Sequence, residues 1–293
     1  MALLLVLLTA FPLAAQQTKR SSGTVQVRVD DNMTKEEARR IAEEQAKIKA
    51  IVNAFGQYVE QETNVTVQEG RSNFNIIGNV RVKGEWVRTL GEVTFNEETR
   101  EEKGTFGTVQ SLWITCKIRG VVKEATPKAN IQYRTLNFPD FRSRATTFAS
   151  GENFYLWFKS PVNGFLSVYV DDGESVYRLL PYDDMPVANT VKVEADKAYI
   201  FFSRENEHNY FGNNVDELVL ITPKKSELNT LHILFSERDY PKPGLTAGYK
   251  TEDGTFLPKS LTLPLFENWL AGNKTSIPDF LDVQVNIEIL RKK

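Results

Sequence analysis

The sequence has few of the side chains on which enzyme chemistry most often depends. Its 293 residues include one cysteine, Cys116, and two histidines, His208 and His232. A single cysteine excludes an intrachain disulfide, and two histidines leave few candidates for a general base or a metal ligand. The motifs G-x-S-x-G, H-E-x-x-H and G-x-G-x-x-G and the P-loop are all missing. The sequence therefore predicts no catalytic residue, no metal site and no cofactor.

The sequence also lacks an excess of charge of either sign. It has 36 basic and 38 acidic residues, which gives a formal net charge of −2 at pH 7. A protein that binds a nucleic-acid backbone normally carries a basic domain or a basic stripe. We therefore expect no nucleic acid among the partners of this chain.

Long apolar runs are missing except at the N-terminus. Residues 2–15, ALLLVLLTAFPLAA, carry no charged side chain, and they are fewer than the roughly 20 residues of a membrane-spanning helix. They are typical of a signal peptide over residues 1–15, with cleavage after Ala15. No Lys or Arg precedes the run, which departs from the usual pattern, and a buried N-terminal strand or helix is the alternative. The signal predicts an exported protein that is periplasmic, outer-membrane associated or secreted, with no transmembrane span in the mature chain.

Residues 16–124 predict a small α+β domain with the order strand, helix, strand, strand. Val25, Val27 and Val29 alternate with polar residues, as in a half-buried strand. Thr34 and Glu37 form a capping box at the start of a helix. The apolar residues at helical spacing, which we expect to face the core, are Ala38, Ile41, Ala42, Ile48, Val52 and Phe55.

Two long β segments are expected to complete this domain. Residues 96–107, NEETREEKGTFG, lie between these segments and are rich in charge, which predicts a solvated hairpin loop. Alternation predicts one shared face for Val80, Val82 and Trp86 in the first segment, and one buried face in the second for Leu112, Ile114, Cys116 and Ile118.

Residues 125–293 predict an immunoglobulin-like β-sandwich domain with a short helix near the C-terminus. From Phe148 onward, short aromatic and β-branched runs alternate with Pro, Gly, Asn and Asp. The predicted buried side of the helix is Leu265, Phe266, Trp269 and Leu270. Strict alternation in the closing strand predicts a core face of Val283, Val285, Ile287 and Ile289.

The second half resembles the bacterial domain of unknown function 4384 family. The resemblance rests on an ordered series: ENFYLWFKSPVNGFLSVYVDDGESVYRLLPY, then KAYIFFSRE and LHILFSERDYPKP, and the closing LFENWLAGN and VQVNIEIL. The first half, TKEEARRIAEEQAKIKAIVNAFGQYV, is similar to N-terminal domains of exported envelope proteins such as flagellar-assembly T-type proteins and small lipoproteins. These resemblances imply a bacterial cell-envelope protein with a non-enzymatic role, and they supply no catalytic residue.

Two pairs of aspartates are candidates for chemistry. Asp171 and Asp172 precede Gly173 between two strand-like runs, where a hairpin turn explains them without any function. A cation site is the alternative there, although the calcium-loop pattern D-x-[DN]-x-[DN]-G is absent. Together with Asp183 and Asp184, they could instead supply the two carboxylates of a glycosidase, which lie about 5–10 Å apart.

The polar loop over residues 205–214, ENEHNYFGNN, is the candidate binding surface. It combines His208, Tyr210 and Phe211 with Asn and Gly, and binding residues concentrate on loops. In the alternative interpretation, this loop only connects two sheets and its aromatic side chains fold back into the core. We expect an exported, non-catalytic protein that binds an unknown protein or glycan partner in the cell envelope. The competing hypothesis is a secreted hydrolase of polysaccharide or peptidoglycan that uses paired carboxylates.

Overall fold

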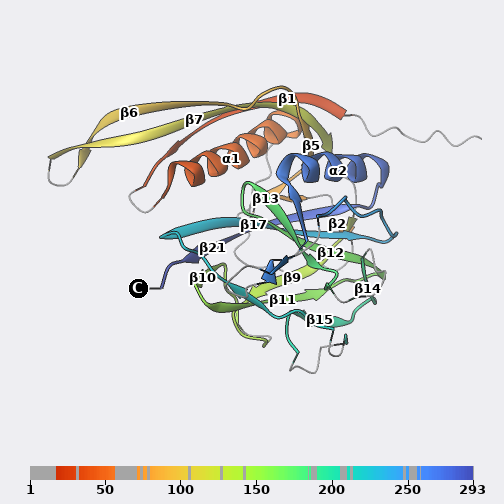
Figure 1. Ribbon diagram of the computed structural model, residues 1–293. Coiled ribbons are helices and arrows are strands. Elements are labelled where there is room, and N and C mark those ends of the chain that lie inside the picture. The colour runs from red at the N-terminus through yellow and green to blue at the C-terminus, as the bar shows by residue number, and fades with distance from the viewer. Residues whose placement is uncertain are drawn as a thin grey trace, which may run out of the picture.

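The computed structural model describes most of the chain after the N-terminal apolar run. The described residues are 18–30, 33–56, 71–72, 75–77, 80–104, 107–125, 128–140, 143–183, 185, 190–204, 210–211, 214–246, 249–250, 256–257 and 259–292. The predicted signal peptide lies outside these residues. Among them, the chain is rich in β-structure and has two helices, which confirms the β-rich α+β class (Figure 1).

The N-terminal part is an antiparallel four-stranded sheet with one helix packed on it. Strand β7 (Gly107–Glu124) lies in the middle, with β1 (Thr18–Arg28) on one edge and both β5 (Gly84–Thr89) and β6 (Thr94–Gly104) on the other. Residues 96–104, expected to be a loop, belong to β6, because they pair with β7 along its whole length. The prediction of a charged loop was therefore wrong, and both strands extend beyond the helix as a long arm.

Helix α1 (Lys35–Phe55) begins where the sequence predicts. Thr34 accepts a hydrogen bond from the Glu37 amide, and the Glu37 carboxylate accepts one from the Thr34 amide. The larger apolar residues of the predicted stripe are only half-buried, because the helix approaches β1 so closely. A Cβ atom on Gly23 would lie 1.9 Å from the Ala46 carbonyl oxygen. The residues that fill this contact are therefore small: Ala38, Ala42, Ala46 and Ala50 are fully buried.

The sheet side of this N-terminal core agrees with the alternation in the sequence. Ile114, Cys116 and Ile118 are buried beneath α1, and Leu112 is half-buried. Val82 and Trp86 join the same cluster. Short strands connect this part to the next: β2 (Arg71–Ser72), β3 (Asn75–Ile77), β4 (Val80–Val82) and β8 (Lys128–Ala129).

The second part is a β-sandwich. Its larger sheet has the order β10-β21-β17-β12-β13-β20, with β14 beside β12, and its smaller sheet joins β9, β11, β15 and β16. The two sheets share one apolar core. The strands are β9 (Gln132–Leu136), β10 (Thr147–Ala149), β11 (Glu152–Lys159), β12 (Gly164–Asp171), β13 (Ser175–Leu180), β14 (Val191–Val193), β15 (Ala198–Phe201), β16 (Leu218–Leu220), β17 (Ser226–Ser236), β20 (Ser260–Thr262) and β21 (Leu281–Leu290), with a separate pair β18 (Tyr249–Lys250) and β19 (Phe256–Leu257).

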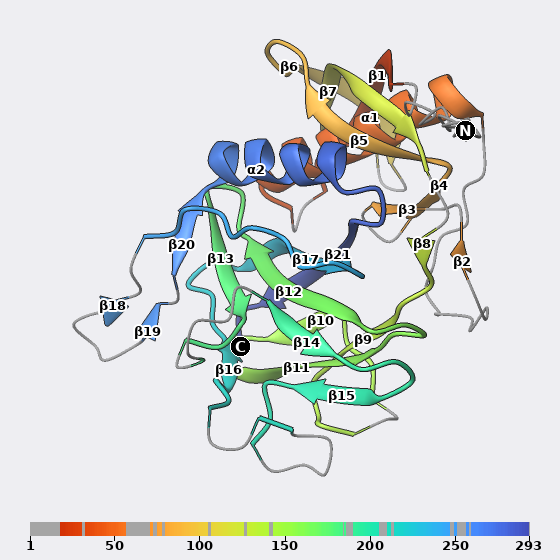
Figure 2. The ribbon, with the colours of Figure 1, turned by 90° about the vertical axis from the view of Figure 1, so that its right-hand side faces the viewer.

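Helix α2 (Leu263–Ser276) covers the outer face of the larger sheet, between that sheet and the N-terminal part (Figure 2). Phe266 and Leu270 are buried against Tyr169, and Trp269 is half-buried there. Leu265 is 58% exposed, so its predicted place on the buried side was wrong. It lies one position before Phe266, and this rotation turns it to solvent.

The closing strand β21 has two different faces. Val283, Val285, Ile287 and Ile289 are buried, as the alternation predicts. The residues between them, Asp282, Gln284 and Asn286, point to the opposite side of the sheet, toward α1 and α2. The outer face of the sandwich is therefore polar where it meets the N-terminal part.

The Asp-Asp-Gly segment is the hairpin turn between β12 and β13. Gly173 has φ of +99°, and the Asp172 carboxylate accepts hydrogen bonds from the amides of Glu174 and Ser175. The Asp171 carboxylate accepts one from the Gly173 amide. Chain reversal therefore accounts for both aspartates, which confirms the predicted hairpin.

Candidate functional site: a charged cavity between two helices and a sheet

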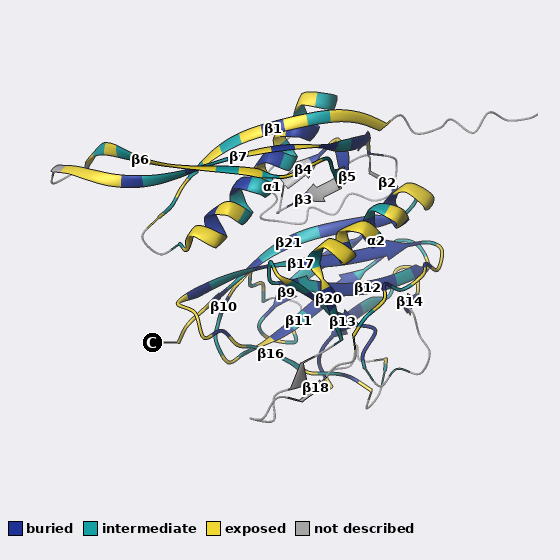
Figure 3. Cartoon of the chain, turned by 45° about the horizontal axis from the view of Figure 1, so that its top comes forward, coloured by how far each residue is buried: buried dark blue, intermediate teal, exposed yellow. Residues whose placement is uncertain are grey.

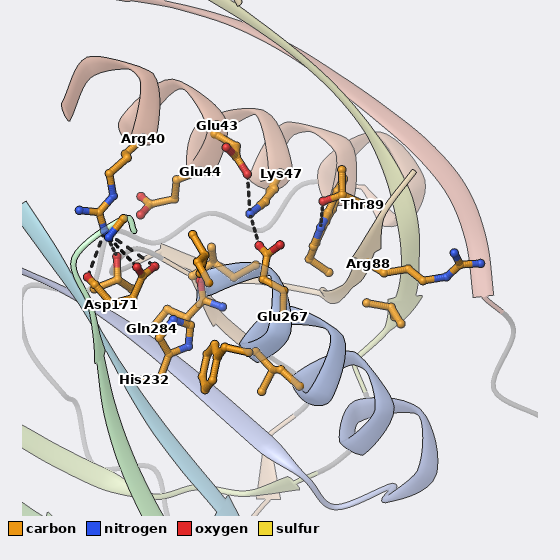
Figure 4. A pocket seen from close by; sticks show the side chains of 18 of the residues that line it. Arg40, Glu43, Glu44, Lys47, Arg88, Thr89, Asp171, His232, Glu267 and Gln284 are labelled. Atoms are coloured by element: carbon orange, nitrogen blue, oxygen red, sulfur yellow. Dashed lines mark hydrogen bonds and ion pairs between the residues drawn. The ribbon is translucent and has the colours of Figure 1, made fainter. Parts of the chain in front are cut away.

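A cavity of about 330 Å³ lies where the two parts of the chain meet. Helix α1 forms one wall, helix α2 forms another, and strands β17 and β21 form the floor, as the close-up shows (Figure 4). The β12–β13 turn and β5 complete it. Residues more than 200 positions apart in the sequence therefore face the same space.

Helix α1 turns its polar side to this cavity. Arg40, Glu43, Glu44 and Lys47 occupy positions i, i+3, i+4 and i+7, so they lie in one row along the helix. All four line the cavity. The opposite side of the helix is the alanine face that packs on β1. The helix thus presents small apolar residues to its own sheet and charged residues to the sandwich.

Arg40 fastens α1 to the sandwich. Its guanidinium donates hydrogen bonds to the Leu228 carbonyl, to the Asp171 carbonyl at 3.2 Å and to the Thr230 hydroxyl at 3.3 Å. Its Nη2 lies 3.9 Å from an Asp171 carboxylate oxygen. Asp171 therefore serves the turn and this contact at once.

Lys47 connects the two helices across the cavity. Its Nζ lies 2.8 Å from Glu43 and 3.5 Å from Glu267 of α2. Burial disfavours its charged form, but the two carboxylates outweigh burial and raise the pKa of Lys47. The ammonium group therefore stays charged and holds both glutamates in place.

Glu44 has a different environment from the other carboxylates of the cavity. Burial raises the pKa of Glu44, although Asn286 donates a 2.8 Å hydrogen bond to its carboxylate and Lys47 and Arg40 favour ionisation. An accessible carboxyl group with a raised pKa can accept or donate a proton, or receive a hydrogen bond from a ligand. Glu44 is therefore a candidate on the α1 wall to exchange a proton or a hydrogen bond with a ligand in the cavity.

The floor of the cavity holds a buried Asp–His pair. His232 Nδ1 lies 2.9 Å from Asp282, and Lys274 and Gln284 donate hydrogen bonds of 2.7 and 2.8 Å to the other Asp282 oxygen. Burial opposes ionisation, but Lys274 and His232 hold the pKa of Asp282 well below its usual range. The carboxylate therefore stays charged and fixes the imidazole, which packs edge-on against Phe266.

A second buried ionic group lies next to this pair and links the same parts of the chain. Glu85 on β5 forms ion pairs with Lys123 and Lys128. The two ammonium groups also donate to the carbonyls of Lys274 and Phe280, which belong to the sandwich part. All three side chains are at most 3% exposed. Burial lowers the pKa of Lys128, against the pull of Glu85.

Of the predicted binding loop, residues 210, 211 and 214 are described, and none of them lines the cavity. His208 is outside the described residues. Tyr210 is exposed, and its ring lies 3.9 Å from the Lys197 ammonium and packs edge-on against Tyr199. Phe211 is half-buried and packs against the rings of Tyr182, Tyr199 and Phe201. The two aromatics therefore differ: Phe211 joins the edge of the core, and Tyr210 presents a face to solvent.

Three of the four carboxylates of the predicted pairs, those of Asp171, Asp172 and Asp183, make structural contacts. Asp171 and Asp172 serve the hairpin turn, and Asp183 lies 2.6 Å from Lys259 and 3.5 Å from Arg178. Asp184 is outside the described residues. Among the described residues, no group of three or more His, Cys, Asp or Glu side chains is placed to hold a metal ion. Cys116 is buried in the N-terminal core and does not line the cavity.

Few patterns in the sequence indicated the cavity. His232 on β17 and Asp282 on β21 are 50 residues apart in the sequence. They are diagonal neighbours, because His232 lies opposite Gln284 and Asp282 lies opposite Leu234. Their polar side chains within apolar strands were the available signal, but alternation alone does not show what covers that face.

Comparison with known proteins gives no assignment. No family model matches the chain, and neither a curated protein nor a solved structure matches it. Neither helix described in the structure is long and apolar enough to cross a membrane.

Proposed function

We propose that this is an exported, non-catalytic protein of the bacterial cell envelope, and that the cavity between α1 and α2 is its ligand site. In this proposal the sandwich is an immunoglobulin-like module, and the resemblance of the second half to the domain of unknown function 4384 family supports the envelope role. The cavity volume, about 330 Å³, is within the range of roughly 300–1,000 Å³ found for small-molecule sites.

One observation carries the proposal: most of the charged groups around the cavity pair with a neighbouring charged or polar side chain. Lys47 lies between Glu43 and Glu267, Arg40 lies beside Asp171, and Asp282 holds both Lys274 and His232. Paired groups keep a fixed position and charge, which suits recognition of a polar ligand better than bond breaking. Glu44, with Asn286 as its hydrogen-bond donor, would accept a hydrogen bond from that ligand.

Isothermal titration with N-acetylmuramyl dipeptide, a soluble envelope glycan fragment, tests this proposal. The full chain is expected to bind it. Glu44→Gln should weaken binding by about tenfold or more, because a hydrogen bond to a charged group contributes roughly 1.5–3 kcal/mol. Glu36→Gln is the matched control, since Glu36 is exposed in the first turn of the same helix. Equal affinities for the two variants, or no binding by the wild type, would refute the cavity as a glycan site.

The loop over residues 205–214 is proposed as a second contact, with a protein partner. Tyr210 supports it, because its ring is exposed and held between Lys197 and Tyr199. Rigid exposed tyrosines give contact area at low entropic cost. In the same proposal, His208 and Phe211 flank this anchor.

The alternative function, a secreted hydrolase of polysaccharide or peptidoglycan, is favoured by one specific feature. Glu44 and His232 line the same cavity, and burial raises the pKa of Glu44, as a general acid requires. Release of soluble sugar from purified peptidoglycan would support it if Glu44→Gln abolished the activity. The non-catalytic proposal predicts no release by the wild type.

A further inference from the structure

The distal end of the β6–β7 arm has no core of its own. Helix α1 reaches the arm at Glu97, which forms ion pairs with Lys35 and Arg39. Beyond that point, none of the described residues in 98–104 and 107–112 belongs to a hydrophobic cluster, and exposed residues line both strands (Figure 3). A two-stranded ribbon is at best marginally stable in water, whereas three or more strands can be stable.

Over residues 107–111, one edge of the arm has no strand paired with it among the described residues. Strand β1 pairs with β7 only from Trp113 to Lys123, and the Leu112 carbonyl accepts a hydrogen bond from the Val29 amide on the same side. Successive residues of a strand direct their backbone groups to alternate edges. Thr108 and Gln110 therefore direct their N–H and C=O groups to the same edge of β7 as Leu112 does. No described strand pairs with them there.

The β6, β1 and β7 edges of the N-terminal sheet differ in charge. The outer edge strand β6 carries four glutamates, Glu97, Glu98, Glu101 and Glu102, and β1 carries Lys19, Arg20 and Arg28 without an acidic residue. Charged residues on an edge strand oppose pairing with a copy of itself. Residues 107–112 of β7, GTVQSL, carry no charge, so self-pairing there brings no like charges together.

We propose that two copies of this chain pair through residues 107–111 of β7 as antiparallel strands. Twofold symmetry is the commonest arrangement of a homo-oligomer, and it places Val109 opposite Val109 of the other copy. Thr108 of each copy then faces Gln110 of the other, so the four open residues form four backbone hydrogen bonds. The result is a four-stranded sheet in the order β6, β7, β7, β6. This assembly is independent of the cavity and of its ligand.

Proline substitutions test the two edges of the arm independently. Gln110→Pro removes an amide that points to the open edge, and it leaves the bonds to β6 intact. Thr99→Pro is the matched control, because residues 98 and 100 pair with residues 113 and 111 of β7, and Thr99 therefore points to the outer edge of β6. In sedimentation equilibrium of the full chain, wild type and Thr99→Pro should be dimers, and Gln110→Pro should be a monomer.

The proposal is overturned by a monomeric wild type at submillimolar concentration, by a dimeric Gln110→Pro, or by a Thr99→Pro that dissociates. A cysteine variant checks the register if Gln110→Pro does not fold. Val109→Cys should form an intermolecular disulfide under mild oxidation, because directly opposed residues of a non-hydrogen-bonded pair lie about 4.5 Å apart at Cα. Lys103→Cys, on the β6 edge, should form no such disulfide. Equal cross-linking of the two cysteine variants would contradict the proposed register.

Discussion

At the scale of single residues, the environment decides what each side chain can do. Cys116 illustrates this, because it is the chain's one thiol and is fully buried beneath α1. Burial raises the pKa of Cys116 to about 11, so almost no thiolate is present near neutral pH.

Cys116 should therefore be inert in the folded protein. At pH 8, Ellman's reagent is expected to leave the native thiol unmodified and to react with one thiol per chain after addition of denaturant. Rapid modification of the native protein would show that the N-terminal core opens.

The two aromatic residues of the predicted binding loop should respond differently to truncation. Phe211→Ala removes contacts with three rings and should cost about 2–3 kcal/mol, somewhat less than a fully buried phenylalanine. Tyr210→Ala should cost less than about 1 kcal/mol, because the ring is exposed and loses one cation–π contact and one edge-on contact with Tyr199. Urea unfolding measures both, and equal losses would mean that Tyr210 is also a core residue.

At the scale of elements, the distance between α1 and β1 explains why the helix face is made of alanine. Gly23 and the alanines let the backbones approach, so the larger residues Ile41 and Ile48 end up only half-buried. The polar side of the same helix then faces the sandwich, where Arg40 and Lys47 find partners.

Gly23→Ala should destabilise the protein because its Cβ meets backbone atoms of α1. The expected loss is about 1–3 kcal/mol, typical of overpacking. Gly272→Ala in α2 is the matched control, since a Cβ there has open space, and alanine in a helix interior is favoured over glycine by roughly 0.5–1 kcal/mol. The midpoint of thermal unfolding should fall for Gly23→Ala and rise for Gly272→Ala.

At the scale of the whole molecule, buried ionic groups join the two parts of the chain. Lys123 and Lys128 reach from the N-terminal part to backbone carbonyls of the sandwich part, and Asp282 holds Lys274 and His232 beside them. Such groups contribute little when complete, but removing one partner leaves a buried charge uncompensated.

Asp282→Asn should therefore cost about 3–5 kcal/mol at neutral pH. Because the pKa of Asp282 is lowered in the folded state, its stabilising effect is present above the unfolded value, about 3.9. The stabilisation by the ionised Asp282 carboxylate is lost as the pH falls below this unfolded pKa. The free energies of unfolding of the wild type and of Asp282→Asn, measured in urea, should differ by a large amount at pH 7. This difference should narrow below about pH 4. A difference in unfolding free energy that does not change with pH would contradict the ionic role of Asp282. Glu98→Gln, on the exposed arm, is the control and should change the free energy of unfolding little.

Local patterns in the sequence were sufficient for much of the fold. The capping box of Thr34 and Glu37 fixed the start of α1, because it depends only on neighbouring residues. Alternation identified the core faces of β7 and β21, and Asp172 with Gly173 identified a hairpin, since side-chain direction in a strand and turn geometry are both local. The β-rich α+β class followed from these elements.

The cavity and the arm depended on tertiary structure. Charged residues in β6 indicated a loop, but pairing with β7 overrode local preference. The predicted burial of Leu265 was wrong, because apolar spacing does not determine the rotation of a short helix about its axis. Arg40, Glu44 and His232 line one cavity only because the polar face of α1 lies over the polar face of the large sheet. A periodic pattern shows which residues share a face, whereas the packing of distant elements decides what that face meets.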